Sequence, residues 1–314
     1  MKTIYFPGET ICNDAYMATI GFFDGVHLGH QYLLKCLRQE AQQRGVPSMV
    51  ITFECHPRQV VQQQWQPELL TTLDEKIRLI RHTGIDMLVV LRFNQQMAAL
   101  SAYDFMDRVL RQSLNVKCLL TGYDNRFGHN RAEGFEDYCR YGQQLGIEVI
   151  CSDALTVGSA NVSSSRIRQL LKAGNVEETH LCLGRPYALS GSVVHGEQIG
   201  RKIGFPTANL QPDDSNQLVP DDGVYAVMVS VEGGQSKRGI MNIGTRPTFN
   251  GKKCTLETNI IDEVGEIYGK SICVEFIGRL REERQFPSGE ALAEQIKKDK
   301  IEAEKILNDY EHES

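Results

Sequence analysis

The sequence predicts an α/β domain built on a doubly wound parallel sheet, followed by a small antiparallel β-barrel with a terminal helix. Over residues 1–182, short apolar runs alternate with helical patterns, which is typical of parallel strands covered by helices on both faces. From residue 183 onward, β-rich runs are separated by turns rich in Gly, Pro, Asn and Asp, which indicates a barrel. Because 314 residues favour two domains, we predict domains at 1–182 and 183–314.

The apolar runs of the first domain are expected to form strands at 17–22, 48–53, 85–93, 116–121 and 147–151. A helix is expected at 31–45, with Gly45 suited to end it. Thr72 and Glu75 have capping-box spacing at the start of another helix, and Ser101 can cap a third. Binding sites in such sheets lie at the carboxyl ends of the strands.

The β-rich runs of the second domain lie at 187–195, 223–231, 238–243, 254–261 and 271–277. A charged amphipathic helix is expected to start near Ser288. Its apolar positions should seal the barrel or a face between the domains, and they are Leu292, Ile296, Ala303, Ile306 and Leu307.

Composition excludes several classes of protein. The net charge of −6 argues against a general nucleic-acid binder, whose affinity would depend on cationic contacts to phosphate. The sequence has no apolar run long enough for a transmembrane helix and no apolar signal segment at its start. Nine cysteines without a Cys-x-x-Cys pair indicate reduced thiols, so we expect a cytoplasmic protein without a membrane partner.

The stretch GFFDGVHLGH, residues 21–30, places His27 and His30 in a glycine-rich turn after the first predicted strand. Zinc would need two more ligands, and the nearest candidates, Cys36, Cys55 and His56, are not grouped in a usual zinc spacing. Both histidines could instead be structural. A third interpretation is phosphate binding, because glycines let the backbone approach a ligand and the following helix offers unpaired N–H groups.

A second glycine-rich and cationic stretch is HGEQIGRKIGFPTANL, residues 195–210. It does not satisfy the Walker A pattern and lacks the βαβ context of a dinucleotide fingerprint. A barrel turn with surface charges is one interpretation. The other is a nucleotide site, because Thr207 and Asn209 lie two apart and an extended segment would point both toward Mg²⁺ and phosphates.

The first stretch resembles the HxGH signature of the nucleotidyltransferase superfamily, and Phe23-Asp24-Gly25 resembles its bacterial flavin branch. Segment 122–134 resembles that branch's Gly-x-Asp/Asn-Phe-x-Phe-Gly motif with Asn125 in place of phenylalanine, and segment 162–171 resembles its Ser-Ser-Ser/Thr-x-Ile-Arg motif. Cys55 stands where proline is usual, and we interpret it as a packing thiol, with His56 a candidate to approach the site. The resemblance implies that His27, His30 and Arg168 stabilise the transition state. It implies flavin contacts at Asp124 and Phe127. The residues that it implies contact ATP or phosphate are Gly21, Phe23, Asp24, Gly25, Gly29, Ser163, Ser164 and Ser165.

The second stretch resembles the riboflavin kinase signature, and matching segments follow in order at 223–227, 242–251, 256–262 and 268–286. The resemblance implies ATP or phosphate contacts at Gly196, Arg201, Gly204, Thr207 and Asn209, the last two also as Mg²⁺ ligands. It places the general base on Glu257 and a flavin or phosphate contact on Arg281. Asn259 stands where histidine is common, with little expected effect on the chemistry. Without the resemblance, Glu257 would be interpreted as an ordinary exposed carboxylate on a strand.

Together, the two resemblances cover essentially the whole chain and are similar to the bifunctional riboflavin kinase/FMN adenylyltransferase family. They imply phosphorylation of riboflavin to FMN, then adenylylation of FMN to FAD with release of pyrophosphate. ATP is the co-substrate and Mg²⁺ the cofactor in both reactions. Riboflavin, FMN, FAD and ATP are then the partners of a monomer or weak homo-oligomer that binds no nucleic acid.

Two rival functions remain at this point. A different adenylyltransferase or a tRNA-activating enzyme shares HxGH, but the first lacks a GFPTAN module and the second normally has a Lys-rich second signature, which we do not find. A flavin-binding sensor on an inactive scaffold is the alternative that is not an enzyme. Turnover distinguishes it from the enzyme.

Overall fold

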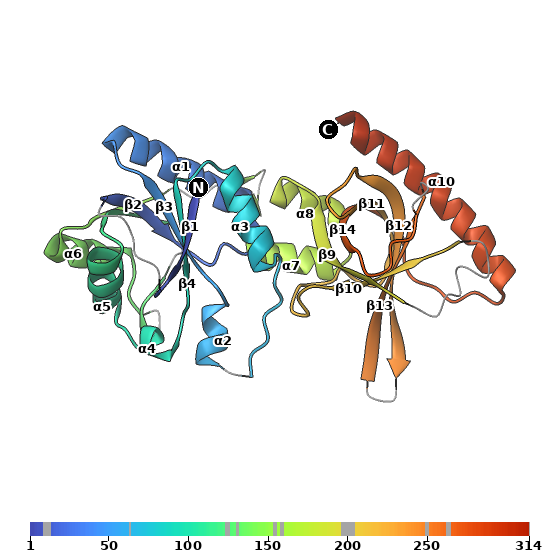
Figure 1. The fold of residues 1–314 in the computed structure, drawn as a ribbon, viewed down its shortest axis with the longest axis horizontal. Coiled ribbons are helices and arrows are strands. Elements are labelled where there is room, and N and C mark those ends of the chain that lie inside the picture. The colour runs from blue at the N-terminus through green and yellow to red at the C-terminus, as the bar shows by residue number, and fades with distance from the viewer. Residues whose placement is uncertain are drawn as a thin grey trace. The chain divides into compact units, whose positions relative to one another are not determined.

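The computed structural model describes residues 1–8, 14–62, 64–122, 126–129, 132–152, 156–157, 160–195, 205–248, 251–261 and 265–313. They divide into two compact units, Met1–Ser163 and Ser164–Ser314 (Figure 1). Each unit has a different architecture, as the change of sequence pattern predicts.

The first unit is built on a parallel sheet. Among the described residues its six strands are β1 (Lys2–Phe6), β2 (Tyr16–Ile20), β3 (Ser48–Phe53), β4 (Met87–Leu91), β5 (Val116–Thr121) and β6 (Glu148–Cys151). Their order across the sheet is β1-β4-β3-β2-β5-β6, and every pair is parallel. The predicted parallel sheet is confirmed, and β1 is a strand that the apolar runs did not indicate.

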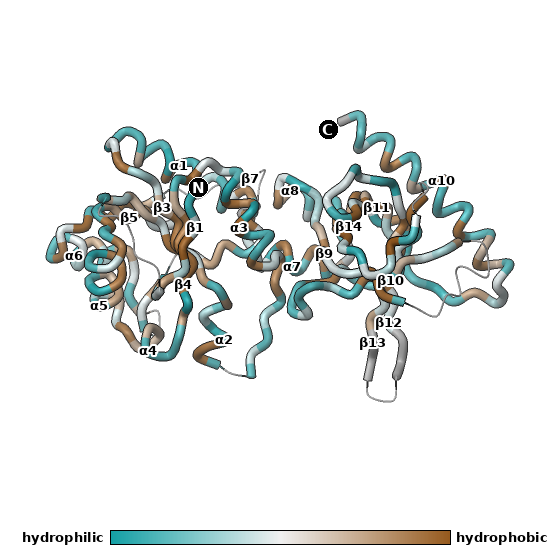
Figure 2. Tube along the Cα trace, viewed as in Figure 1, coloured by the Kyte–Doolittle hydropathy of each residue, from teal (hydrophilic) through white to brown (hydrophobic). Residues whose placement is uncertain are grey.

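Helices cover both faces of this sheet. The helical segments are η1 (Asp24–Val26), α1 (Leu28–Arg44), α2 (Pro57–Val61), α3 (Leu73–His82), α4 (Gln95–Ala98), α5 (Ala102–Asp104), the π-helical η2 (Phe105–Ser113) and α6 (Phe135–Leu145), and a short hairpin is formed by β7 (Thr156–Val157) and β8 (Ala160–Asn161). Successive side chains of β3 point to opposite faces of the sheet. Val50 packs with α1 and α3, whereas Met49 and Ile51 pack with η2 and α6. The strands carry the hydrophobic residues that form this core (Figure 2).

Local capping signals place the helices as the sequence indicates. Gly45 ends α1 in the left-handed region at φ 65°, and its N–H donates to the carbonyls of Ala41 and Gln42. The Thr72 side chain accepts a hydrogen bond from the Glu75 N–H at the start of α3, and Ser101 caps α5.

The second unit is a closed antiparallel barrel with helices at both of its sequence ends. Its elements are α7 (Ser164–Lys172), α8 (Val176–Leu183), β9 (Tyr187–Val194), β10 (Ala208–Pro212), β11 (Gly223–Val231), β12 (Lys237–Thr248), β13 (Gly251–Ile260), β14 (Ser271–Arg281) and α10 (Gly289–Glu313). The strand order around the described barrel is β10-β13-β12-β11-β14-β9, returning to β10. The fold class that we predicted is therefore confirmed.

The long helix α10 covers the outer face of the barrel. Ala303 and Leu307 are buried against Val224, Ala226 and other apolar residues of β11 and its neighbours. Hydrophobic positions alternate with hydrophilic ones along α10 (Figure 2). The predicted sealing of the barrel by the terminal helix is confirmed at Ala303, Ile306 and Leu307.

Helices α7 and α8 are fastened to the barrel by β14. The backbone N–H of Arg279 donates to the Glu177 carboxylate at 2.7 Å, and its Nη1 donates to the Ala173 carbonyl at 3.1 Å. The Asp221 N–H donates to the Leu171 carbonyl at 2.9 Å. By contacts, the second unit therefore begins at Ser164, and the functional boundary near residue 182 stays a prediction.

Among the residues that the structure describes, none of the helices combines the length and the apolar character needed to cross a bilayer.

Candidate active sites

Residues 21–30, here called the histidine turn, follow the carboxyl end of β2. Phe23, Gly25 and Val26 have φ of 54°, 78° and 39°, in the left-handed region where glycine is favoured. His27 then caps α1, and its Nδ1 accepts a hydrogen bond from the His30 N–H at 3.3 Å. The two imidazoles are stacked, with ring centroids 3.6 Å apart and planes inclined by 18°. The turn thus presents two histidines at the N-terminus of a 17-residue helix.

Gly29 fits closely into this packing. A Cβ there would lie 3.2 Å from the His27 ring and 3.5 Å from the carbonyl oxygen of Val162. A Cβ on Gly21 would likewise lie 3.0 Å from the Phe23 ring. The position of Val162 shows that the chain leading to Ser163 passes beside the histidine turn, within the first unit.

His30 is held as a neutral imidazole. Burial lowers its pKa well below 6.5, and the positive charges of His27 and Lys76 add to this effect. In the described part of the chain, its buried Nδ1 has no hydrogen-bond partner. The edge of the Phe23 ring also packs against it, at 5.2 Å between centroids. A neutral ring of this kind can donate or accept a hydrogen bond without carrying a charge.

A second segment, residues 70–76, holds the turn and is called the anchor segment. One carboxylate oxygen of Asp24 accepts hydrogen bonds from the N–H groups of Leu70 at 2.9 Å and Thr71 at 3.3 Å. The Thr71 hydroxyl accepts from the Gly25 N–H at 3.2 Å. At the end of the segment, Lys76 is buried, with 3% of its surface exposed. Asp24 and Gly25 thus fix the turn to this segment, and their predicted phosphate contacts stay predictions.

Lys76 is a residue that sequence reasoning missed. A signal was present, because Leu73, Ile77 and Ile80 form the apolar stripe of α3 and Lys76 falls on the same face. A lysine inside such a stripe must find acceptors for its ammonium hydrogens or lose stability.

His56 lies near the histidine turn, as we proposed. Its ring packs against Phe22 at 4.6 Å and against Trp65 at 4.6 Å, and its Nδ1 caps α2 by accepting from the Arg58 N–H. The neighbouring Cys55 is half-buried, and burial raises its thiol pKa. That environment suits the packing role that we assigned to it.

In the barrel, strand register brings the second set of predicted residues together. Asn209 of β10 lies directly opposite Glu257 of β13, and Glu257 lies directly opposite Asn242 of β12. Directly opposed residues of antiparallel strands point to the same side of the sheet. We call these three residues the polar row. Asn242 is a further residue that sequence reasoning did not single out.

The polar row lies on the outer side of the barrel wall. Its neighbours one position along each strand, Ala208, Thr258 and Met241, are buried and opposed to one another, as expected for the inner side. Asn242 is opposed to Val224, which packs against α10. The row therefore borders the face that α10 covers.

Asn259 extends the pairing of β10 and β13 by one step. Its Nδ2 donates to the carbonyl oxygen of Pro206 at 2.7 Å, immediately before Thr207. The described strand pairing of these two strands ends at Ala208 and Thr258. Beyond the last backbone pair, the Asn259 side chain therefore holds the Pro206 carbonyl, which belongs to the peptide that joins Pro206 to Thr207.

Asn209 lies opposite Glu257, Thr207 precedes Asn209 by two residues, and the oxygen donors of these three side chains fit Mg²⁺. A hydroxyl at Thr207, an amide at Asn209 and a carboxylate at Glu257 are hard ligands of the kind that this ion shares with nucleotide phosphates. No group of three or more His, Cys, Asp or Glu suited to a metal occurs within the described ranges.

Two family models match the chain, one for each half. The model described as FAD synthetase matches residues 10–166, and the model described as riboflavin kinase matches residues 183–307. Two proteins named bifunctional riboflavin kinase/FMN adenylyltransferase, from Escherichia coli (strain K12) and Bacillus subtilis (strain 168), are 39% and 38% identical to it. The matches cover 92% and 96% of this chain and 92% and 97% of the relatives.

The chain belongs to the bifunctional riboflavin kinase/FMN adenylyltransferase family. A crystal structure from Streptococcus pneumoniae, titled a macrolide-efflux protein, has the same fold, with a TM-score of 0.87 and 32% identity over 96% of this chain and 98% of that one. The family that the motifs resemble is thereby confirmed. The riboflavin kinase match also accounts for the second half of the chain.

Other predicted residues belong to neither the histidine turn nor the polar row. Ser163 ends the first unit, whereas Ser164 and Ser165 open α7, which also carries Arg168. Phe127 is buried in the sheet core, stacked on Tyr138 at 4.1 Å. The predicted contacts at Asp124, Gly196, Arg201 and Gly204, and the departure at Asn125, lie outside the described residues.

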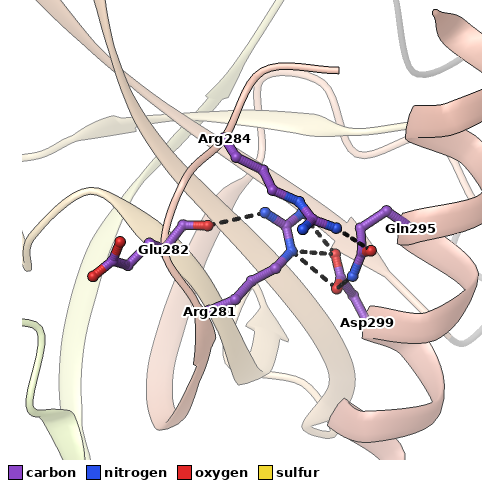
Figure 3. A network of polar contacts seen from close by, with 5 residues as sticks. All are labelled: Arg281, Glu282, Arg284, Gln295 and Asp299. Carbon is purple, nitrogen blue, oxygen red and sulfur yellow. Dashed lines mark hydrogen bonds and ion pairs between the residues drawn. The ribbon is translucent and has the colours of Figure 1, made fainter. Parts of the chain in front are cut away.

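Arg281 joins β14 to α10. Its Nε donates to both carboxylate oxygens of Asp299, at 3.0 and 3.1 Å, and its Nη2 donates to one of them at 2.8 Å (Figure 3). Its Nη1 donates to the Glu282 carbonyl at 3.0 Å, and Gln295 donates to Asp299 at 2.7 Å. Three of the five guanidinium N–H groups are thus engaged by described partners, which leaves two for a ligand.

This ion pair predicts a specific loss of stability in the riboflavin kinase unit. Asp299 is 5% exposed, so Asp299→Ala strands a half-buried guanidinium, and we expect the unit to lose about 3 kcal/mol. The measurement is the urea concentration at which kinase activity is half lost. Asp309→Ala removes an exposed carboxylate from the same helix and should leave that midpoint unchanged. Equal midpoints for both variants would contradict a stabilising pair.

Proposed function

We propose that the polar row of the second unit phosphorylates riboflavin and that the histidine turn of the first unit adenylylates the resulting FMN. The two reactions are those of the family to which the chain belongs. The observation that carries the assignment of residues is that each unit holds its own signature set: stacked histidines on a helix N-terminus in one, and an amide-flanked carboxylate in the other.

In the kinase reaction, Glu257 accepts the proton of the terminal ribityl hydroxyl. The hydroxyl oxygen then bonds to the γ-phosphorus of ATP, the bond from that phosphorus to the bridging oxygen breaks, and ADP leaves. Thr207 and Asn209 would hold Mg²⁺, which neutralises phosphate charge when bound. Asn242 and Asn209 flank Glu257 and orient its carboxylate, while Asn259 fixes the backbone that carries Thr207.

In the adenylyl transfer, a phosphate oxygen of FMN bonds to the α-phosphorus of ATP, and pyrophosphate leaves with the bridging oxygen. The nucleophile is already an anion, so the site needs no strong base. The neutral ring of His30 and the ring of His27 donate hydrogen bonds to phosphoryl oxygens as charge builds there. The N–H groups at Gly29 and the start of α1 bind phosphate.

Several further residues complete the proposal. Gly21 and Phe23 shape the turn, and Ser163, Ser164, Ser165 and Arg168 bind ATP phosphates. Phe127 and Arg281 contact the flavin, the latter through its two remaining N–H groups. We also propose a cytoplasmic monomer or weak homo-oligomer that binds no nucleic acid, in keeping with the net charge of −6.

One time course tests the proposed function. The purified chain is incubated with riboflavin, ATP and Mg²⁺, and the flavins are separated chromatographically at intervals. We expect FMN to appear first and FAD later, because the second reaction consumes the product of the first. FMN alone, even with reduced flavin, would remove the adenylyl assignment. Neither product would favour the flavin-binding sensor.

A further inference from the structure

Lys76 is a buried lysine whose acceptors are both backbone carbonyls. Its Nζ donates to the carbonyl oxygen of Phe22 at 3.2 Å and to that of Phe53 at 3.1 Å. The ammonium also lies 4.1 Å from the centroid of the Phe22 ring. These contacts replace the water that burial of a charge removes.

The two carbonyls stand at the ends of neighbouring strands. Phe22 follows β2 and leads into the histidine turn, and Phe53 is the last residue of β3. The Thr52 hydroxyl donates to the same Phe22 oxygen at 3.1 Å. The carboxyl ends of parallel strands are where such sheets bind their ligands. Lys76 therefore sets the spacing of two strand ends at the start of the adenylyl site.

The helix that carries Lys76 is attached to the turn by other bonds. Asp24 accepts from Leu70 and Thr71, and Thr72 caps α3. Replacing Lys76 leaves these bonds in place, so the helix should keep its position while the two strand ends lose their shared donor.

We propose that Lys76 is a positioning residue for adenylyl transfer, which fixes Phe22 and Phe53 so that His27 and His30 are held toward the phosphoryl group. The inference rests on the proposed assignment of this reaction to the histidine turn. It adds to that assignment a residue outside every motif that the sequence indicated.

The charge of Lys76 contributes as well as its hydrogen bonds. Burial lowers its pKa to about 8, which the negative charge of Asp24 partly opposes, as does the Cys55 thiol. Its positive charge in turn acts on His30 and helps to keep that ring neutral. His56 also packs against Phe22, so Asp24, Cys55, His30 and His56 are the titratable groups that the described contacts place near the ammonium.

The test uses two variants of the full chain and one matched control. Lys76→Met keeps the length of the side chain and removes its donors, whereas Lys76→Arg keeps a charged donor. Lys35→Met removes an exposed lysine from α1. FAD formation from FMN and ATP is measured under steady-state conditions, and riboflavin phosphorylation is measured in each variant to show that the chain is folded.

We expect Lys76→Met to lower kcat for FAD formation about tenfold to a hundredfold, the effect of a misplaced catalytic group. Lys76→Arg should recover part of that loss, and Lys35→Met should match the wild type. Riboflavin phosphorylation should be unchanged in all three.

The pH profile separates positioning from a general loss of structure. In the wild type, FAD formation should fall as pH rises through about 8, where Lys76 loses its proton. Lys76→Arg should lack this fall, because a guanidinium keeps its charge at such pH. In Lys76→Met, the loss of FAD formation at low pH should begin at a higher pH than in the wild type. The reason is that His30 loses a neighbouring positive charge that lowers its pKa.

Two results would overturn the inference. One is wild-type kcat in Lys76→Met. The other is a loss that is equal at every pH and is not recovered by Lys76→Arg, since that pattern indicates a structural role alone. If His30→Ala leaves FAD formation intact, the assignment of the reaction fails instead, and the two failures are distinguishable.

Discussion

Replacing His30 by alanine is expected to abolish FAD formation while riboflavin phosphorylation stays nearly unchanged. The ring is stacked on His27, and burial holds it neutral, so its hydrogen bond to a phosphoryl oxygen is formed without a charge to desolvate. Removing one such donor typically costs a hundredfold to a thousandfold in rate, and we expect a loss of at least about a hundredfold. FAD formed from supplied FMN and ATP is the measurement.

His30 also predicts how FAD formation depends on pH in acid solution. Because the pKa of His30 lies well below 6.5, the ring is neutral at neutral pH and takes up a proton only as pH falls through that lower value. FAD formation should therefore persist into mildly acid solution. His82→Ala, which removes an exposed histidine from α3, is the matched control. If folded His30→Ala protein lost both activities, the assignment of one reaction to each unit would be wrong.

Glu257→Gln is expected to have the opposite effect, abolishing FMN formation while FAD formation from supplied FMN continues. Glutamine keeps the size of the side chain but cannot take the proton of the ribityl hydroxyl, and a positioned base contributes about a hundredfold to ten-thousandfold. The flanking amides of Asn209 and Asn242 can still hydrogen-bond to glutamine, so the strands should remain paired. FMN formed from riboflavin and ATP is the measurement.

A matched control for this variant lies outside the polar row. Glu266→Gln changes an exposed carboxylate of the same unit and should leave both activities unchanged. Riboflavin phosphorylation that survives in Glu257→Gln would show that another group accepts the proton. Loss of FAD formation from supplied FMN in the same variant would contradict the independence of the two sites.

The hydrophobic pattern of the sequence predicted those strands in which most residues are buried. Every residue of β2, β3 and β4 is buried, and each was visible as an apolar run. In β1 only Ile4 is fully buried, and β10 alternates Ala208 and Leu210 with polar residues, so neither stood out. The outer parts of β12 and β13 pair with each other beyond their apolar runs, which is set by the partner strand rather than by composition.

The candidate sites were predictable as motifs but not as contacts. His27 and His30 lie three apart on one helix start, so spacing alone brings them together. Asn242 meets Glu257 only through strand register, and Lys76 reaches Phe22 across 54 residues of chain. Such long-range pairings depend on how elements pack, which local patterns do not encode.

The fastening of α7 and α8 to β14 bears on how this gene could be divided. A fragment that starts at residue 183, where the riboflavin kinase match begins, would leave Arg279 without Ala173 and Glu177. A fragment that starts at residue 164 would keep those bonds but would take Ser164, Ser165 and Arg168, which we propose bind ATP phosphates, away from the first unit. On this proposal, one short stretch of chain serves both units, and no single cut leaves each half with every residue that it uses.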